Sequence, residues 1–167
     1  KGYGVPKDYK EAIKWTRKAA EQGYLLAVYD MGVYYDKGHG IPQDYQMAIK
    51  WWTKAAEKNH PLAQFNLGLM IENGRVVKED VTEAVAWYRK SAEQGNADAQ
   101  NNLGQMYLLR QGVSEDYKVS VKLLRQLATE QGDAHAMHRL GWLYQQGRGV
   151  PKNNKIAEKW WTLASKQ

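Results

Sequence analysis

Hydrophobic residues along this chain recur at the spacing of helices rather than strands. In the segment that starts at Tyr45, apolar and aromatic side chains occupy positions i, i+3, i+4, i+7, i+10 and i+11, which lie on one face of an α-helix. Asp44 is a favourable N-cap for this helix because its carboxylate can accept hydrogen bonds from the first free backbone N–H groups. A preceding helix is expected over residues 25–36, and Gly38 marks its end because glycine readily adopts positive φ.

This two-helix pattern is repeated along the whole chain. A block that reads Ala-Val-Tyr-Asp-Met-Gly at residues 27–32 returns in related form three more times, and its final glycine recurs at intervals of 36, 36 and 37 residues. Periods of roughly 20 to 50 residues are typical of solenoid proteins. The sequence therefore predicts an all-α solenoid that forms one continuous domain. Its expected units are residues 1–24 (a partial repeat, made of a second helix), 25–60, 61–96, 97–133 and 134–167.

The repeated glycine lies inside the first helix of each unit, where glycine costs about 1 kcal/mol relative to alanine. Its recurrence indicates close packing, because a residue without a side chain lets the partner helix approach. Small residues at one position of the second helices support this interpretation. The glycines are Gly32, Gly68, Gly104 and Gly141, and the small residues are Ala48, Ala84, Ser120 and Ala157.

Three sequence blocks follow one another in a fixed order: Ala-x-x-x-Leu-Gly-x-x-Tyr, then Gly-x-Gly-Val-x-x-Asp, then Ala-x-x-Trp-x-x-Lys-Ala-Ala-Glu-Gln-Gly. This combination resembles the Sel1-like repeat, a relative of the tetratricopeptide repeat, over essentially the whole chain. The resemblance implies a right-handed α/α superhelix of helix-turn-helix repeats whose first helices line a concave face. It also implies a non-enzymatic role in holding another protein, as in bacterial host-interaction proteins and eukaryotic adaptors.

The chain departs from the repeat pattern at a few positions. Val76 and Arg110 replace loop glycines in the second and third units. Leu123 and Leu127 stand where the other units mostly have Trp and Ala or Ser. Such irregularity is typical of a natural sequence rather than of an idealised consensus design.

No motif for catalysis or for cofactor binding stands out. His135 and His138 lie three residues apart on a predicted helix, but a metal site needs three or four ligands with supporting hydrogen bonds. A pair on the helix surface is therefore the preferred interpretation. We expect no enzyme activity, no metal and no cofactor. Tryptophans that recur at the repeat period are interpreted mostly as packing residues; these are Trp15, Trp51, Trp87 and Trp160.

The composition of the chain indicates which kinds of chemistry and of binding partner are not expected. The chain has no cysteine, which excludes disulfide bonds and thiol chemistry. It has no apolar run close to the roughly 18 residues of a membrane span, so no membrane insertion is expected. The net charge is +6, but the 24 Lys and Arg residues are spread along the chain, which favours solvated helix faces over nucleic-acid binding. The resemblance to exported bacterial proteins favours a periplasmic or secreted location.

Positions that differ between repeats are the candidates for partner binding, because positions held constant serve the shared fold. They lie three residues before, one after and four after the repeated glycine. The resulting surface is expected to be apolar and aromatic in two units, amide-rich in the third and mixed in the fourth, which suits a peptide or helix of another protein. Burial between repeats is an equal alternative for Phe65 and Leu69. The full set is Tyr29, Val33, Asp36, Phe65, Leu69, Glu72, Asn101, Gln105, Leu108, His138, Trp142 and Gln145.

The ends of the chain and its aromatic residues suggest further possibilities. The sequence starts with an orphan second helix and ends with Trp160 and Trp161, whereas terminal repeats normally need a polar outer face. We therefore expect further repeats in a parent protein, or an end-to-end homo-oligomer through the uncapped ends. The alternative function is a ligand-binding module that holds a cell-wall sugar or peptidoglycan fragment through exposed Trp and Tyr rings.

Overall fold

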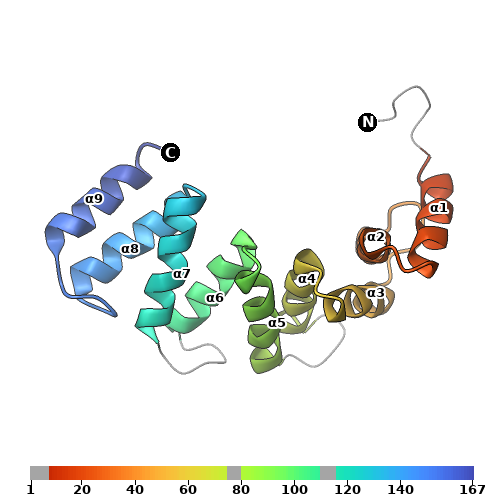
Figure 1. Cartoon of the computed structure of the whole chain (residues 1–167), viewed down its shortest axis with the longest axis horizontal. Helices are drawn as coiled ribbons and strands as arrows, with labels where there is room; N and C mark the ends of the chain where they lie inside the picture. Colours follow the sequence, from red (N-terminus) through yellow and green to blue (C-terminus); the bar gives the residue numbers. More distant parts are fainter. Residues whose placement is uncertain (1–7, 75–79, 110–115) are drawn as a thin grey trace. The chain divides into compact units, whose positions relative to one another are not determined.

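A computed structural model describes residues 8–74, 80–109 and 116–167 of the chain. Within these ranges it contains nine α-helices and no strand (Figure 1), which confirms the all-α fold class. The loop positions Val76 and Arg110 and the opening block of residues 1–7 lie outside the described residues. The helices are α1 (Tyr9–Glu21), α2 (Leu25–Lys37), α3 (Tyr45–Glu57), α4 (Pro61–Glu72), α5 (Val81–Glu93), α6 (Ala97–Leu109), α7 (Tyr117–Glu130), α8 (Ala134–Gln146) and α9 (Asn154–Ala164).

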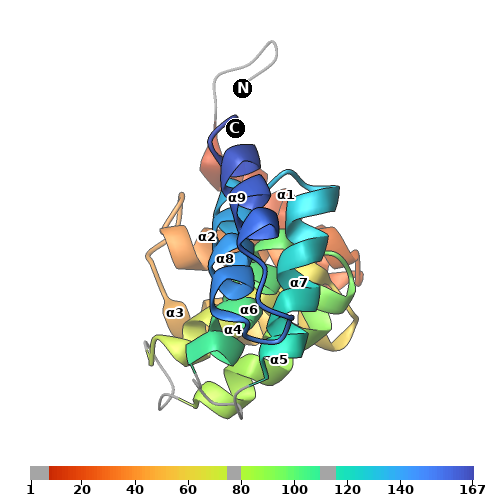
Figure 2. The same ribbon diagram turned by 90° about the vertical axis from the view of Figure 1, so that its left-hand side faces the viewer.

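The helices form two compact units, the first ending at Asp80 and the second starting at Val81. In the first unit α1 packs on α2, α2 on α3 and α3 on α4. In the second unit each helix from α5 to α9 likewise packs on the next, and α8 and α9 run alongside each other (Figure 2). Packing between neighbours in the sequence is the arrangement expected of helical repeats.

The helix ends follow the predicted cap chemistry. The carboxylate of Asp44 accepts a hydrogen bond from the backbone N–H of Met47 at 3.0 Å, as expected for the N-cap of α3. Gly38 ends α2 in the left-handed conformation with φ of 66°. The helix predicted over residues 25–36 extends to Lys37, one residue further. Asp8, Asp116 and Asn153 cap α1, α7 and α9 with their side chains in the same way.

The in-helix glycines differ in how closely they are packed. The indole ring of Trp52 lies against Gly32, where an added Cβ would sit 2.9 Å from Trp52 Cε2 and still closer to its Nε1. At Gly104 the neighbouring helix comes close through Ser120, whose hydroxyl donates to the Gly104 carbonyl at 3.0 Å. A bulky ring therefore fills the space above Gly32, and a small polar residue approaches Gly104.

A second recurring contact joins three of the second helices, α1, α5 and α7, to the first helix of the following repeat. Arg17 donates to the Tyr35 hydroxyl at 3.1 Å and Arg89 donates to the Tyr107 hydroxyl at 2.7 Å. A third pair follows the same rule, with Arg125 donating to the hydroxyl of Tyr144. The corresponding residues between α3 and α4 are Thr53 and Ile71. Arginine and tyrosine thus occur together or are replaced together within this chain.

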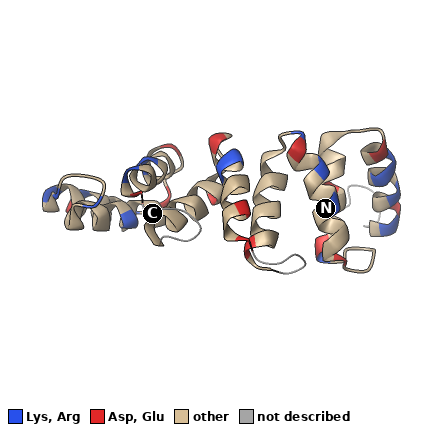
Figure 3. Cartoon of the chain, turned by 90° about the horizontal axis from the view of Figure 1, so that it is seen from below, with Lys and Arg blue, Asp and Glu red and all other residues tan. Residues whose placement is uncertain are grey.

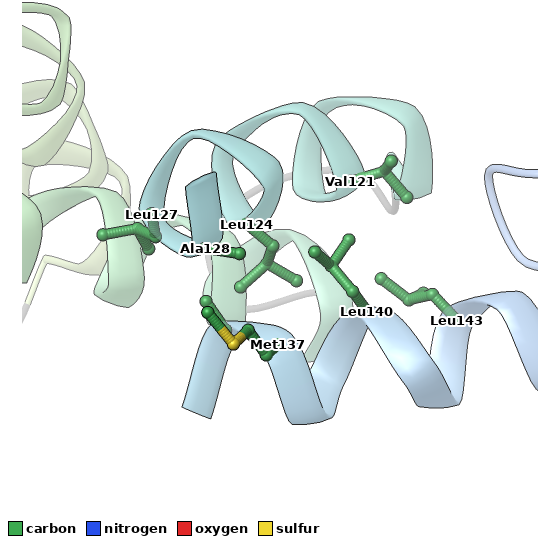
Figure 4. Packing of buried hydrophobic residues seen from close by; sticks show 8 residues of the cluster. Val121, Leu124, Leu127, Ala128, Met137, Leu140 and Leu143 are labelled. Carbon is green, nitrogen blue, oxygen red and sulfur yellow. The ribbon is translucent and has the colours of Figure 1, made fainter. Parts of the chain in front are cut away.

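The core of the second unit is formed mainly by leucines. Leu124 of α7 points toward Leu140 of α8, and Leu143 lies next to Leu140, whereas Leu127 belongs to the same cluster but points away from these two (Figure 4). All four expose 1% of their surface or less. Of the two leucine substitutions in the third repeat, Leu127 therefore forms part of an apolar core, in which each buried leucine contributes about 1.5–3 kcal/mol.

Candidate functional site

Four of the predicted partner-binding residues line one hollow in the first unit. The hollow has a volume of about 350 Å³ and lies on α2 and α4, with Trp52 of α3 also lining it. Its apolar lining includes Val33 and Leu69, and Leu69 exposes 37% of its surface. The predicted members are Tyr29, Val33, Asp36 and Leu69, and those that the sequence did not single out are Lys37, Trp52, Asn66, Met70 and Asn73.

The tyrosine ring in this hollow is held in place from two sides. Tyr29 stacks on His60, with ring centroids 4.6 Å apart and ring planes at 16°. Burial raises the pKa of Tyr29. The hydrogen bond between Tyr29 and the side chain of Asn66 opposes this rise without cancelling it. Asp30 and Asp36 add to this rise in pKa. The phenol is therefore held as one of several polar groups, with Asp36, Lys37, Asn66 and Asn73, beside the apolar lining of the hollow, and such a mixture of apolar surface and placed polar groups is common in ligand and peptide sites.

Two charged residues of the hollow pair with each other, and the other predicted residues of the first unit do not line it. Lys37 Nζ lies 2.9 Å from Asp36 Oδ2. Phe65 and Glu72 are half-buried on α4 and do not line the hollow. Of the predicted residues, the hollow is therefore lined by three from α2 and by Leu69 alone from α4.

His60, which stacks on Tyr29, makes the stability of the first unit depend on pH. Its Nδ1 accepts the backbone N–H of Ala63 at 3.2 Å as the N-cap of α4, a role that only an unprotonated Nδ1 can fill. Burial lowers the pKa of His60 below 6.5, and the neighbouring Asp30 opposes this shift. The folded state therefore binds fewer protons than the unfolded state in this range, so stability rises with pH and is lost as pH falls through 6.5 and below.

We expect the His60→Asn variant to lose less stability than the wild type between about pH 7.5 and pH 5.5. Asparagine keeps the cap without titrating, as Asn96 does at the same repeat position by accepting the Ala99 N–H at 2.8 Å. Burial raises the pKa of Asp30, which contributes the opposite trend at more acidic pH in both proteins. Urea unfolding at a series of pH values measures the difference, and parallel pH profiles for the two proteins would contradict it.

In the second unit the side-chain amides of two predicted residues already accept hydrogen bonds from another residue of the chain. Arg139 Nη1 donates to Asn101 Oδ1 at 2.7 Å, and with its amide oxygen facing the guanidinium Gln105 accepts from the same Nη1 at 3.0 Å. Burial lowers the pKa of Arg139, while Asp133 acts in the opposite direction. The amide-rich surface expected in the third repeat is therefore a bridge from α6 to α8. Sequence reasoning missed Arg139.

The remaining predicted residues of the second unit lie in different settings. Leu108 packs against the leucine core, whereas Gln145 is exposed. His138 is exposed, and its backbone carbonyl accepts the indole N–H of Trp161 at 3.1 Å. Trp142 exposes 38% of its surface, and the guanidinium of Arg148 lies 5.2 Å from its ring centre. None of these four residues lines the three pockets described in the second unit.

The recurring tryptophans are only partly packing residues. Trp51, Trp87 and Trp160 are half-buried, as expected, but Trp15 exposes 58% of its surface. The Nε1 of Trp15 donates to Glu11 at 2.8 Å and the ammonium of Lys18 lies 4.7 Å from the ring centre, so this ring is held by neighbouring charges on its own helix. Such a contact is a cation–π interaction.

Charges of both signs are distributed over the described helices. Basic and acidic residues are scattered among uncharged ones, as Figure 3 shows, and α4 and α6 carry no Lys or Arg. His135 and His138 are both exposed on α8, and no group of three or more His, Asp or Glu side chains that could hold a metal ion occurs among the described residues. None of the described helices is long and apolar enough to span a membrane.

Comparison with known proteins places the chain in a family. The model of the Sel1 repeat matches residues 1–24, 25–60, 61–96, 97–132 and 134–167. A search of curated proteins gave no match. Solved structures of bacterial proteins do match, among them a protective antigen present in uropathogenic Escherichia coli strains that displays an SLR fold, with 41% identity and a TM-score of 0.93 over 99% of this chain.

Two further solved structures extend this comparison. A Sel1 repeat protein from Oxalobacter formigenes is 35% identical, with a TM-score of 0.90 over 95% of this chain. Cysteine-rich protein B of Helicobacter pylori is 28% identical, with a TM-score of 0.61 over 81% of this chain and 97% of its own. The chain spans 35% of the Escherichia coli protein and 65% of the Oxalobacter protein.

These matches agree with the repeat period, the cap positions and the helix order described above. Sel1 repeat proteins are generally protein-interaction scaffolds and are typically non-catalytic. The family model covers nearly every residue of the chain, and helix pairs of the kind it describes fill both compact units. The chain therefore belongs to the Sel1 repeat family.

Proposed function

We propose that this chain is a protein-interaction scaffold that holds a peptide segment of another protein on the first helices of its repeats, with the hollow on α2 and α4 as the anchor site. The observation that supports the proposal most is the hollow itself. It collects four residues that were selected from the sequence by their place on the first helices and their variation between repeats, and it combines apolar surface with the held ring of Tyr29.

The chemistry of the hollow favours an apolar or aromatic anchor from the partner. Val33, Leu69 and Met70 offer apolar surface, and the Tyr29 ring offers an amphipathic edge. Asp36, paired with Lys37, supplies a charged rim. An apolar core with a polar rim is the usual anatomy of a site that buries one or two anchor side chains of a partner.

Substitution of Leu69 tests this site. We expect Leu69→Glu to weaken binding of the partner by tenfold or more, because a carboxylate would be buried against the partner's apolar anchor. Leu62→Glu is the matched control, since Leu62 lies on the same helix, exposes 42% of its surface and does not line the hollow. A partner is first captured with the wild-type chain and identified, and its affinity for the three purified proteins is then measured by calorimetry.

Two outcomes would count against the proposal. Equal loss of affinity in Leu69→Glu and Leu62→Glu would indicate a general effect of charge on α4, and retention of affinity in both would place binding elsewhere on the chain. Titration with a muropeptide, under the same conditions, checks the alternative function. Saturable binding of the muropeptide in the absence of any peptide binding would favour the cell-wall ligand instead.

A further inference from the structure

A second pocket lies in the second unit, on α5, α6 and α7. Its volume is about 590 Å³, which falls in the range typical of small-molecule sites. Leu103, Tyr107 and Leu123 contribute apolar lining. Charges of both signs also line it, from Arg89, Lys122, Glu93 and Glu130. None of its lining residues belongs to the predicted partner-binding set, so this pocket is independent of the proposed scaffold site.

The repeat register explains why space exists here. Leu123 occupies the position at which the other second helices carry Trp15, Trp51, Trp87 and Trp160. Two repeats earlier, the residue equivalent to Leu123 is Trp51. The hydrogen-bonded pair Arg17 and Tyr35 is equivalent to Arg89 and Tyr107, which line the pocket. The third repeat therefore keeps the arginine–tyrosine pair next to this position, has Gln100 where that earlier repeat has Val28, and replaces the indole with a shorter side chain that has no N–H group.

A buried hydrogen-bond acceptor lines the same pocket. Gln100 exposes 2% of its surface, and its Nε2 donates to the carbonyl of Ala92 at 3.1 Å. Its Oε1 is buried and has no hydrogen-bond partner within the described part of the chain. Buried side-chain oxygens are nearly always paired. An unpaired amide oxygen in a pocket wall favours a ligand that brings a hydrogen-bond donor.

We infer that this pocket binds an indole ring, which restores the group that the repeat pattern lacks at Leu123 and donates its N–H to Gln100 Oε1. The ring is planar and apolar, and its single donor matches the single unpaired acceptor. The guanidinium of Arg89 is held by the Tyr107 hydroxyl at 2.7 Å, within the same lining, where arginine commonly packs on aromatic faces. The indole can come from a free small molecule or from a tryptophan side chain of a partner.

Binding of 5-fluoroindole, followed by its fluorine NMR signal, tests the inference. The wild-type chain is expected to shift or broaden the signal in a saturable way. The Leu123→Trp variant supplies the indole from the chain itself and is expected to weaken binding at least tenfold. Leu109→Trp is the control, because it adds a tryptophan in place of a leucine that exposes 63% of its surface and does not line the pocket, and it should bind as the wild type does.

The role of Gln100 is tested by changing the ligand as well as by changing the residue. The first test uses the wild-type chain, so its result does not depend on whether a variant folds. In the wild-type chain 5-fluoro-1-methylindole, which lacks the N–H, is expected to bind at least tenfold more weakly than 5-fluoroindole. Gln100→Met, which carries the residue found at the same position as Met137, should bind the two ligands equally. Circular dichroism confirms that each variant remains helical.

The possible results decide the inference. Absence of saturable binding to the wild type, unchanged binding in Leu123→Trp, or equal binding of the two ligands by the wild type would each overturn it. N-acetyl-tryptophanamide distinguishes the source of the ring. If it binds as tightly as indole, the pocket accepts tryptophan within a peptide, and if only indole binds, the pocket accepts a free small molecule.

Discussion

Replacement of Leu140 by alanine is expected to lower the free energy of unfolding by about 2–5 kcal/mol. Leu140 has no exposed surface and lies in α8 among the leucines that α7 contributes to the core. Its truncation would remove apolar contacts and leave a cavity, because neighbouring helices that are packed on both sides can close the space only in part. Unfolding in urea, followed by circular dichroism, measures the change.

Leu163→Ala provides the matched control for this prediction. Leu163 is also a leucine of the second unit, but it lies on α9 and exposes 46% of its surface. Its truncation is expected to change the free energy of unfolding by about 0.5 kcal/mol or less. If the two substitutions had similar effects, the core described here would not be the main source of stability in α7 and α8.

Much of the fold could be predicted because local chemistry determines it. Asp44 caps its helix with its own side chain, and Gly38 ends the preceding helix through a backbone conformation that glycine favours. Both effects act within a few residues of the sequence. The repeat then places the same effects in every unit, so that one well-understood helix pair was sufficient to predict the others.

The candidate site was harder to predict because it depends on contacts between repeats. Asn101 and Gln105 were selected as variable positions, but Arg139 is 38 residues after Asn101 and binds both amides. A variable position can face the next repeat as well as a partner, and the spacing of apolar residues does not distinguish these cases. The Arg17–Tyr35 and Arg89–Tyr107 contacts show that a signal was available, because residues that vary together between repeats indicate such a contact.

The pocket at Leu123 has a related explanation. The replacement of tryptophan by leucine was visible in the sequence, but whether the neighbouring helices close over a missing ring depends on packing. Leu124 and Leu127 show the opposite outcome on the same helix, since both are fully buried in the core. The side of α7 that meets α8 is filled, whereas the side that carries Leu123 retains a pocket.

Substitution of the repeated glycine by alanine is expected to have opposite effects in two repeats. Alanine is favoured over glycine inside a helix by about 1 kcal/mol, and at Gly104 an added Cβ would meet Leu124 at an ordinary distance of 3.6 Å. Gly104→Ala should therefore raise the free energy of unfolding by about 0.5–1 kcal/mol. At Gly32 the added Cβ would overlap the indole of Trp52, which exposes only 3% of its surface.

The Gly32→Ala variant is consequently expected to lose about 1–3 kcal/mol of stability, the usual cost of overpacking. The indole of Trp52 is rigid and enclosed, so it can move only by displacing α3 from α2. The same ring lines the hollow on α2 and α4, so this variant should also weaken partner binding, whereas Gly104→Ala should leave it unchanged. Urea unfolding of both variants measures the first effect. If both variants gained stability, the absence of a side chain at Gly32 would not be required for the packing of Trp52.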